Sequence, residues 1–579
     1  MAGLWEGAIK TQNQHGQSGK NLPEKHHEYP QNAQNKREII GIHPPLHEKT
    51  PTSHTILLLG LSIKTLAINY YVSPFGNDND TGESSTNPFR TLQHAANVSL
   101  AGDTIFAMNG LYSSTSGPVL NITGSGTPEG YITFKAMPGH QPRITASGNV
   151  WNAVSINGSY IVLEGFELIG NNANITYEKA FAIYTEAANG GKNWSVYANY
   201  NTNGISIGGP RDETKFPHHV TIRNCKVHDF PGGGISSIQA DYTTIENNVV
   251  YNNGWYMMYA GSGISILNPF NSDKATTYKN IVRNNICSSN KTTIPWISLK
   301  RLSDGNGIII DVNQYPYGAK AGEGQPYGGR TLVENNVCFN NGGSGIHSFL
   351  ADHVDIINNT AYHNGTVVGY PDIFTNQCKD VNIINNIMYA REGGDCNSRP
   401  RSATEVYSNN LYFNGKVGFQ GSNDMIADPQ FMNLSTDLAT ANFKLKKSSP
   451  AIDQGSSLKG QYSAVDIVGT PRPQGGKPDR GAYEFVSENV STSSSTLLAK
   501  AKVILYPNPV KEKLSIRLAD HQSSPYRVDI LDTLGATVQQ QTIAPQTKEL
   551  DVAALPAGLY LLVLYQKDQG TSVYKFVKQ

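Results

Sequence analysis

The stretch Arg330–His347, RTLVENNVCFNNGGSGIH, contains the two short phrases that decide the fold. The first phrase begins with an apolar or aromatic residue and has asparagine one or two positions later. It recurs along the chain as IRNC (Ile222–Cys225), IENN (Ile245–Asn248), VRNN (Val282–Asn285), VENN (Val333–Asn336), INNT (Ile357–Thr360), INNI (Ile384–Ile387) and YSNN (Tyr407–Asn410). The second returns as Gly234-Ile235, Gly263-Ile264, Gly307-Ile308 and Gly345-Ile346. Alternation of two short β phrases is typical of a parallel β-helix, in which each repeat forms one rung.

We therefore predict an all-β chain: a right-handed single-stranded parallel β-helix with an N-terminal helical cap and a small C-terminal β-sandwich. Aligned asparagines at a turn can form a hydrogen-bonded ladder, and asparagine tolerates the left-handed backbone of sharp corners. Residues Asn87–Leu100 place apolar side chains at helical spacing. A helix there would cover the open end of the solenoid and its unpaired strand edge.

The distance between successive asparagine phrases locates the irregular rungs. It is 23 residues from Asn224 to Asn247, then 37 to Asn284 and 51 to Asn335, followed by 23, 27 and 24 in the later rungs. Extra length in a solenoid repeat forms loops, often on the binding face. The two longest repeats are adjacent, so we expect their loops to project from the same edge.

Both extra loops precede the Gly-Ile strand of their rung. They carry Trp255, Tyr256 and Tyr259 in the first loop, and Pro295, Trp296, Lys300, Arg301 and Asp304 in the second. Neighbouring rungs are about 4.8 Å apart, so aromatic rings, phenols and cations should gather over one strand face.

Strand alternation predicts which side chains face outward beneath these loops. In GIIID, Ile308 and Ile310 should point inward and Asp311 outward; in GIHSF, Ile346 should point inward and His347 outward. Asp311 and His347 are therefore expected on the outer surface of successive rungs.

Composition limits the partners and the cofactors. The formal net charge is zero, which gives no electrostatic footprint for nucleic acid. Cys225, Cys287 and Cys338 each follow the asparagine phrase and are expected to stack inward, whereas Cys378 and Cys396 can form a disulfide in an oxidising compartment. No CxxC pair occurs, which argues against a structural zinc site.

The chain divides into segments of different composition. We predict an N-terminal extension and signal peptide at 1–69, a catalytic β-helix at 70–413, a C-terminal cap of the β-helix at 414–486, a Ser/Thr linker at 487–499 and a further domain at 500–579. Within the first segment, His54–Asn69 is too short to span a bilayer and is typical of the apolar part of a signal peptide. The long polar stretch before it suggests a true start downstream of Met1.

The last segment resembles the C-terminal sorting domain of the type IX secretion pathway. The resemblance rests on LYPNP (Leu505–Pro509), LDTLG (Leu531–Gly535) and LPAGLYL (Leu555–Leu561), in this order. It implies transport by the type IX machinery, followed by release or attachment at the cell surface. We expect a monomer.

The residues of the two long loops fit β-elimination on an acidic polysaccharide. This reaction needs a cation to neutralise the uronate carboxylate, a group that removes the C5 proton and a group that protonates the leaving oxygen. Lys300 and Arg301 can supply the charge, a tyrosine or lysine can move the proton, and Trp255 and Trp296 can stack on sugar rings. His347 and Asp311 are further candidates for substrate contact.

The runs Asn252–Ile266, Pro295–Asp311 and Arg330–His347 resemble β-helix proteins related to polysaccharide lyase family 31, which includes alginate lyases. The resemblance implies a catalytic tyrosine and a downstream lysine. Lys300 matches the lysine, and the tyrosine matches either Tyr259 or Tyr256.

Two other readings compete with a lyase. A glycoside hydrolase would use a pair of carboxylic acids, for which the long rungs offer Asp304 and Asp311, with Asp273 more remote. A non-catalytic adhesin or glycan-binding protein would bind without turnover. Asp304 and Asp311 are also candidate calcium ligands, because calcium prefers oxygen donors.

Overall fold

The structure is a computed structural model that describes residues 67–208, 216–319, 322–458, 460–487, 504–517, 526–531, 537–543, 549–566 and 570–579. The chain divides after Ser487 into two compact units, which are described separately. Most of the predicted signal peptide and linker lie outside the described residues. No helix in the described segments has the length and hydropathy of a membrane span.

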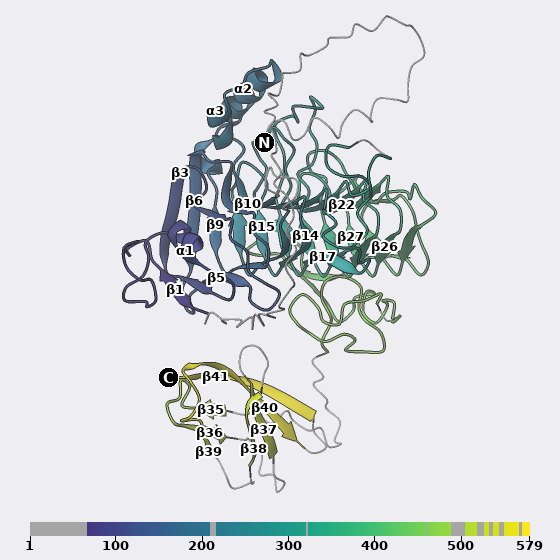
Figure 1. The fold of residues 1–579 in the computed structure, drawn as a ribbon. Coiled ribbons are helices and arrows are strands. Elements are labelled where there is room, and N and C mark those ends of the chain that lie inside the picture. Colours follow the sequence, from purple (N-terminus) through teal and green to yellow (C-terminus); the bar gives the residue numbers. More distant parts are fainter. Residues whose placement is uncertain are drawn as a thin grey trace, which may run out of the picture. The chain divides into compact units, whose positions relative to one another are not determined.

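Three long parallel sheets form the first unit, and the chain visits them in a fixed order in each rung (Figure 1). Sheet 1 consists of β1 (Asn69–Val72), β2 (Thr104–Ala107), β5 (Ile132–Ala136), β8 (Ile161–Glu164), β11 (His218–Arg223), β14 (Asp241–Glu246), β17 (Tyr278–Arg283), β20 (Arg330–Glu334), β23 (Val354–Ile357), β26 (Val381–Ile384) and β29 (Glu405–Ser408).

Sheet 3 follows sheet 1 within each rung. Its members are β3 (Gly110–Ser116), β6 (Pro142–Asn149), β9 (Glu167–Ile169), β12 (Lys226–His228), β15 (Val249–Tyr251), β18 (Ile286–Ser288), β21 (Val337–Phe339), β24 (Thr360–Tyr362), β27 (Ile387–Tyr389), β30 (Leu411–Phe413) and β32 (Met425–Ile426).

Sheet 2 completes the rung and carries the Gly-Ile strands. It contains β4 (Leu120–Ile122), β7 (Asn152–Ile156), β10 (Asn203–Gly208), β13 (Ile235–Ile238), β16 (Ile264–Leu267), β19 (Ile308–Asp311), β22 (Ile346–Phe349), β25 (Ile373–Asn376), β28 (Asp395–Asn397) and β31 (Lys416–Val417). The predicted right-handed parallel β-helix is thereby confirmed.

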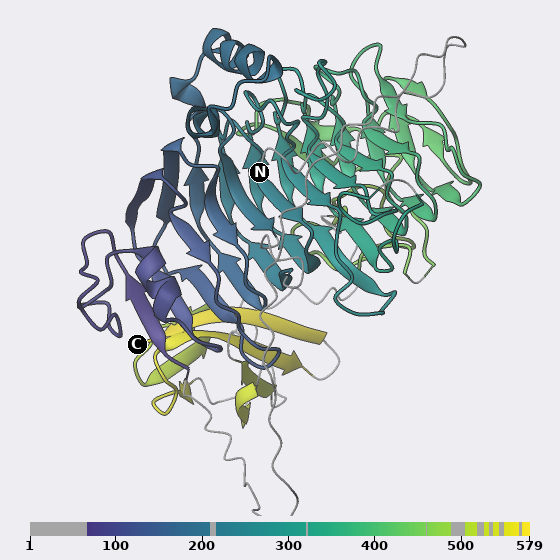
Figure 2. The same cartoon turned by 45° about the horizontal axis from the view of Figure 1, so that its top comes forward.

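Helices are few and stand outside the rungs. Helix α1 (Leu92–Val98) packs against β4 and buries Leu92, Ala95 and Ala96, so the predicted N-terminal helix is confirmed. Helices α2 (Tyr177–Ala188) and α3 (Trp194–Asn199) stand at one edge beside β3 and β6 (Figure 2).

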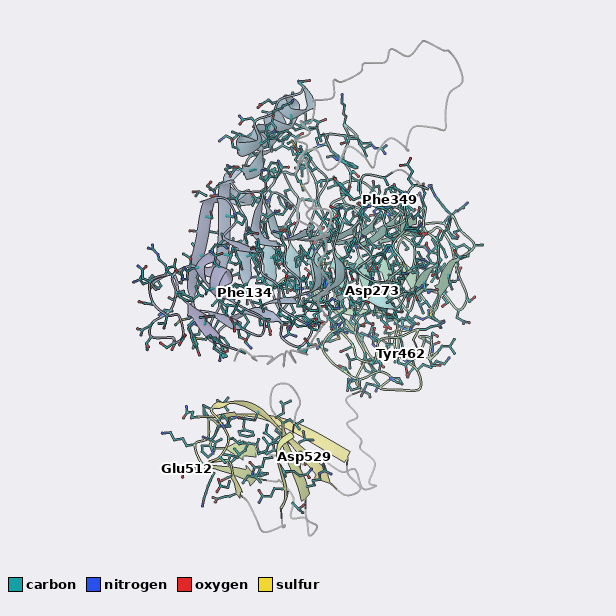
Figure 3. All side chains as sticks on the ribbon, viewed as in Figure 1. Phe134, Asp273, Phe349, Tyr462, Glu512 and Asp529 are labelled. Carbon is teal, nitrogen blue, oxygen red and sulfur yellow. The ribbon has the colours of Figure 1, made fainter. Side chains whose placement is uncertain are left out.

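The interior is an apolar column formed by the inward-facing side chains of all three sheets. Ile308, Ile310 and Ile346 have no exposed surface, and Phe134, labelled in Figure 3, is equally buried. All five cysteines are buried and free, so Cys378 and Cys396 are not joined. Cys225, Cys287 and Cys338 belong to this core, as predicted, and Cys287 and Cys338 pair on successive rungs.

The predicted asparagine ladder runs along the corner between sheets 1 and 3. It is built by the second asparagine of each phrase: the Nδ2 of Asn285 donates to Oδ1 of Asn336 over 3.0 Å, and Asn336 donates in turn to Asn359. The series Asn248, Asn285, Asn336, Asn359, Asn386 and Asn410 ends on the carboxylate of Asp424.

A second ladder, which the sequence analysis did not identify, runs along the corner between sheets 3 and 2. It comprises Asn253, Asn290, Asn341 and Asn364, and it ends on Oδ1 of Asp372. The two ladders thus have the same construction, with amides in the middle and a carboxyl at the end.

The first asparagine of each phrase has a different role. It takes the left-handed backbone, with φ near 55° at Asn224, Asn335 and Asn358. In the later rungs its Nδ2 binds the C-terminal segment of the unit: Asn335 donates to Val465 O, Asn358 to Asp479 O, Asn385 to Gln461 O and Asn409 to Gln454 O. The segment that we expected at the end of the solenoid therefore lies along four rungs.

That segment has its own apolar contacts and a buried ion pair. Strands β33 (Phe431–Asn433) and β34 (Asn442–Leu445) pack with Phe339 and Tyr362 of sheet 3. Arg472 donates to Glu484 over 2.8 Å, and both side chains are almost fully buried.

The second unit consists of two antiparallel sheets around an apolar core. One contains β35 (Ile504–Tyr506), β36 (Lys513–Arg517) and β39 (Glu549–Asp551); the other contains β37 (Tyr526–Leu531), β38 (Thr537–Ile543), β40 (Gly558–Gln566) and β41 (Gly570–Lys578).

Candidate functional site

The outer face of sheet 2 changes character along the solenoid. Strand pairing aligns one outward column in the order Ser155, Ser206, Ser236, Ser265, Ile309, His347 and Phe374. Small hydroxyl side chains thus give way to bulky ones at β19, the sheet 2 strand of the longest rung. This is the strand over which the predicted loops were expected.

The register refines the predicted positions of Asp311 and His347. Asp311 pairs with Phe349, whereas His347 pairs with Ile309. The two candidate residues therefore lie in neighbouring outward columns of successive rungs. Their predicted outward orientation agrees with the core, which contains Ile308, Ile310 and Ile346 but not His347 or Asp311.

The loop between β18 and β19 ends in a tight turn that carries the two cations. Trp296 N donates to Arg301 O over 2.9 Å, and Lys300 N donates to Trp296 O over 2.7 Å. Lys300 takes φ of 54° to close this turn. Lys300 and Arg301 are exposed, and neither makes an ion pair within the described residues, so both charges are available to an anion.

The base of the same loop is tied to the rungs on either side. Gly305 N donates to Gly261 O, and Gly343 N donates to Gly305 O, each over 2.8 Å. Asn306 is fully buried; its Nδ2 donates to Ser262 Oγ, and its Oδ1 accepts from Ser344 N. This three-rung tie fixes the position of the adjoining Asp304.

Asp304 and Asp311 are carboxyls whose pKa values are raised. Burial raises the pKa of Asp304 to about 6, against the hydrogen bonds that it accepts from Ser303 and Asn306. Burial, with the nearby charge of Asp304, raises the pKa of Asp311 well above its ordinary value. Both carboxyls are therefore harder to ionise than an exposed aspartate, and two such carboxyls side by side are suited to acid–base chemistry.

His347 is buried in aromatic surroundings. Its ring stacks on Phe374 with centroids 4.5 Å apart, and Tyr370 lies at 5.6 Å. Neither ring nitrogen has a hydrogen-bond partner among the described residues. Burial lowers the pKa of His347 to about 3, so the ring is neutral at physiological pH.

Tyr370 joins these groups and was missed in the sequence. Burial raises the pKa of its phenol and Asp304 adds to this, while a hydrogen bond with Ser303 and the charge of Arg301 oppose it. Tyr370 lies in the 27-residue rung between Asn358 and Asn385, which is four residues longer than the preceding one. That modest excess length was the feature of the sequence that could have pointed to Tyr370.

The two tyrosines predicted to be catalytic lie elsewhere. Tyr259 is 6% exposed and packs with Trp151, Tyr197 and Ile294 beneath α2 and α3. Its phenol oxygen has no hydrogen-bond partner in the described part of the chain, and burial raises its pKa. Tyr256 is half-buried at the margin of the same cluster, and no hydrogen bond joins either phenol to Lys300 among the described residues.

The two predicted tryptophans also separate. Trp296 stands in the turn beside Arg301. Trp255 donates its indole Nε1 to Ser289 O and has the Lys291 ammonium 4.0 Å from its ring centroid. Trp255 and Tyr256 line a cavity of their own, whereas Arg301, Asp304, Asp311, His347 and Tyr370 form the candidate site, hereafter the β19 cluster.

The β19 cluster can perform acid–base chemistry on an anionic substrate. It combines the exposed Arg301 guanidinium, a carboxyl with a pKa of about 6, a second carboxyl whose pKa is raised by burial, a neutral imidazole and a phenol. Within the described residues, no group of three or more His, Cys, Asp or Glu side chains could hold a metal ion.

Comparison with known proteins identifies the type of β-helix. The family described as Pel9A-like, right handed beta helix region, matches residues 70–382. Pectate lyase L of Thermoclostridium stercorarium is 26% identical over 402 residues, which cover 64% of this chain and 28% of the relative. The chain therefore spans less than a third of that relative's length.

Among solved structures, pectate lyase Pel9A aligns with a TM-score of 0.46 at 17% identity, over 72% of this chain and 97% of the other. A rhamnogalacturonan lyase aligns with a TM-score of 0.35 at 17% identity, over 64% and 91% of the two chains.

The C-terminal unit matches the family described as secretion system C-terminal sorting domain, over residues 504–579. The type IX sorting domain expected from its motifs is confirmed. Such a domain supports secretion or attachment at the cell surface.

Proposed function

Since the chain belongs to the Pel9A-like right-handed β-helix family, we propose that it is a polysaccharide lyase that cleaves an acidic, uronic-acid-containing polysaccharide by β-elimination. The observation that carries this proposal is the position of the exposed Lys300–Arg301 turn beside the half-buried acid–base groups of the β19 cluster. The pectate lyase relative supports it at the level of the substrate class.

In this proposal, each group has one role. Lys300 and Arg301 bind the uronate carboxylate and stabilise the enolate-like charge that forms after the C5 proton leaves. Asp304, ionised above about pH 6, accepts that proton. Tyr370 or Asp311 donates a proton to the leaving O4, and Trp296 contacts a neighbouring sugar ring.

Two assignments of the catalytic phenol compete. The resemblance to family 31 assigns this role to Tyr256 or Tyr259, paired with Lys300. The position of Tyr370 beside the other groups of the β19 cluster favours Tyr370 instead. Tyr259 is almost fully enclosed, so a polymer would reach it only after the loop opens. We favour Tyr370, because its environment includes Arg301 and Asp304.

Alginate is the substrate that the family 31 resemblance favours, and pectate is the one that the curated relative favours. Asp304 and Asp311 supply two carboxylates toward calcium, which takes six to eight oxygen ligands. Calcium dependence is therefore part of the test, and no step of the proposed reaction passes through the ion.

The test is an activity assay on alginate, glucuronan, pectate and glycosaminoglycans, with and without a calcium chelator. β-Elimination creates a C4–C5 double bond, which is followed by its ultraviolet absorbance. A signal on one polymer that is lost in Arg301→Ala and retained in Lys444→Ala, an exposed lysine of β34, supports the lyase and gives its substrate.

A glycoside hydrolase is the second candidate, because Asp304 and Asp311 are an acid pair with raised pKa values. Reducing ends released without ultraviolet absorbance would favour it over the lyase. Binding to a polymer with neither signal would favour the glycan-binding alternative.

A further inference from the structure

A second cavity lies at the corner where sheet 3 turns toward sheet 2. Its volume is about 330 Å³, and its lining includes Ile169, Asn172, Asp229, Trp255 and Tyr256. None of the residues of the β19 cluster lines it. We propose that this cavity binds one neutral sugar residue, as a site separate from the β19 cluster.

Asn172 provides a hydrogen-bond acceptor that the protein leaves unused. Its Nδ2 donates to Asn252 O over 2.8 Å, which fixes the orientation of the amide because a carbonyl can only accept. Its Oδ1 is buried and has no partner among the described residues. A buried acceptor without a donor is costly. Because Asn172 lines the cavity, a small shift of its side chain on binding would bring Oδ1 to a sugar hydroxyl, which would supply that donor.

Asp229 provides a second acceptor and a negative charge. Its Oδ2 lies 2.7 Å from His228 Nδ1, and its Oδ1 accepts from Asn252 over 3.1 Å. Although burial alone would raise the pKa of Asp229, these hydrogen bonds lower it overall. The carboxylate is thus ionised at neutral pH and would repel a uronate.

Trp255 and Tyr256 provide the apolar side of the cavity. The chain between them and β15 is held by Gly254 N, which donates to Gly232 O over 2.7 Å, and Tyr256 N donates to Pro231 O over 3.2 Å. The Trp255 indole is fixed by its bond to Ser289 O and by Lys291 over one face. Fixed aromatic rings beside polar acceptors are a common arrangement for sugar recognition.

Together these features specify the chemistry of the ligand. Two acceptors require a ligand rich in donors, the aromatic rings require an apolar ring face, and the Asp229 carboxylate disfavours an anion. A cavity of about 330 Å³ has room for a single hexose or pentose rather than a longer segment. This site does not depend on the proposed lyase activity: it concerns a neutral branch or neighbouring glycan, whichever reaction the β19 cluster performs.

The experiment is a binding titration of the full chain with methyl glycosides of galactose, glucose and mannose, each beside its uronic acid counterpart. Saturation-transfer NMR and calorimetry would measure dissociation constants, which should be millimolar for a ligand of this size. At least one neutral glycoside should bind, about tenfold more tightly than its uronate. Asn172→Ala should weaken this binding about fivefold, and Asp229→Asn should reduce the discrimination against the uronate about tenfold.

Two controls separate this site from its surroundings. Asn174→Ala removes a neighbouring exposed side chain that bonds only Asn171, and it should leave binding unchanged. Arg301→Ala removes a group of the β19 cluster and should also leave it unchanged. Circular dichroism melts of each variant would identify any loss of folding.

Three results would overturn the inference. One is that no neutral glycoside of the panel binds. Another is that binding persists unchanged in folded Asn172→Ala and Tyr256→Ala variants. The third is that the uronates bind as tightly as the neutral sugars.

Discussion

Along the corners of the β-helix, buried amides are paired from rung to rung, whereas on the outer face of sheet 2 buried polar groups lack such pairing. Asn359 makes hydrogen bonds with Asn336, Asn386 and two carbonyls. His347 makes none in the described residues. A satisfied polar network stabilises a fold, while a buried group without partners costs stability and is typical of a site kept for a ligand or for chemistry.

The largest effect should come from Arg301→Ala. The lost charge would no longer stabilise the developing anion, and turnover should fall about 100-fold or more. Because Arg301 is exposed and makes no ion pair in the described chain, the unfolding free energy should hardly change. Initial rates and urea denaturation of the same preparation measure both quantities. Wild-type turnover in this variant would remove Arg301 from the proposed mechanism.

The second effect concerns the ladder itself. Asn359→Ala removes the acceptor of the Asn336 backbone N–H and one of the two acceptors of the Asn336 side-chain amide, and should lower the unfolding free energy by about 3 kcal/mol. Turnover per folded molecule should stay the same. Chemical denaturation is the measurement.

The matched control for the ladder is Asn224→Gly. Glycine accepts the left-handed backbone of this exposed corner, and the change loses one hydrogen bond of 3.3 Å to Glu164. If Asn224→Gly lowered the unfolding free energy as much as Asn359→Ala, the buried ladder would contribute no more to stability than the exposed corner residues.

The two ladders end on different carboxyls, Asp372 and Asp424, whose effects on stability can be compared. Burial raises the pKa of Asp372 to about 7, and its Oδ2 has no partner among the described residues. The folded state therefore holds a proton that the unfolded state has lost, so stability falls as the pH rises from about 4 to about 7. Asp372→Asn should remove this fall and raise stability by about 2 kcal/mol at pH 8, with no gain at pH 4.

Asp424, at the end of the other ladder, is the counterpart. Its carboxylate accepts hydrogen bonds from Asn410, Tyr412 and Gly421. Asp424→Asn should therefore destabilise the protein at pH 8. Denaturation series at several pH values test the pair, and equal responses of the two variants would contradict the comparison.

The smallest effect should come from His347→Phe. An apolar ring of similar shape keeps the stacking on Phe374 and removes two buried nitrogens that have no partners. We expect a gain of about 1 kcal/mol in unfolding free energy. A loss of turnover in this stabilised variant would assign His347 to substrate contact, whereas unchanged turnover would leave it a packing residue.

The repeat predicted the fold because its information is local and periodic. Each asparagine phrase marks a corner, and alternation along GIIID distinguishes Ile308 and Ile310 from Asp311 without knowledge of the loops. The second ladder escaped notice because Ser289 and His363 precede two of its asparagines, where each phrase of the first ladder has a preceding asparagine.

The site was predicted less completely, because loop packing depends on contacts that spacing does not encode. The turn that presents Lys300 and Arg301 lies in the predicted loop. Tyr259, from the neighbouring loop, faces Trp151 and Tyr197 instead, owing to α2 and α3, whose position no repeat signal gives. Tyr370 comes from a third rung whose excess length is small.

The segment after β32 is bound to four corners of the solenoid. This attachment limits where insertions can be accepted as the sequence evolves. Asn335, Asn358, Asn385 and Asn409 are bound by this segment and bracket the near-uniform intervals of 23, 27 and 24 residues. An insertion that shifted one of these corners would break several hydrogen bonds at once. The intervals of 37 and 51 residues start at Asn247 and Asn284, before this attachment begins, and both end by Asn335. The molecule thus has a tethered half whose repeat length varies by at most four residues and an untethered half in which new loops, and with them new specificities, can be acquired at low cost to folding.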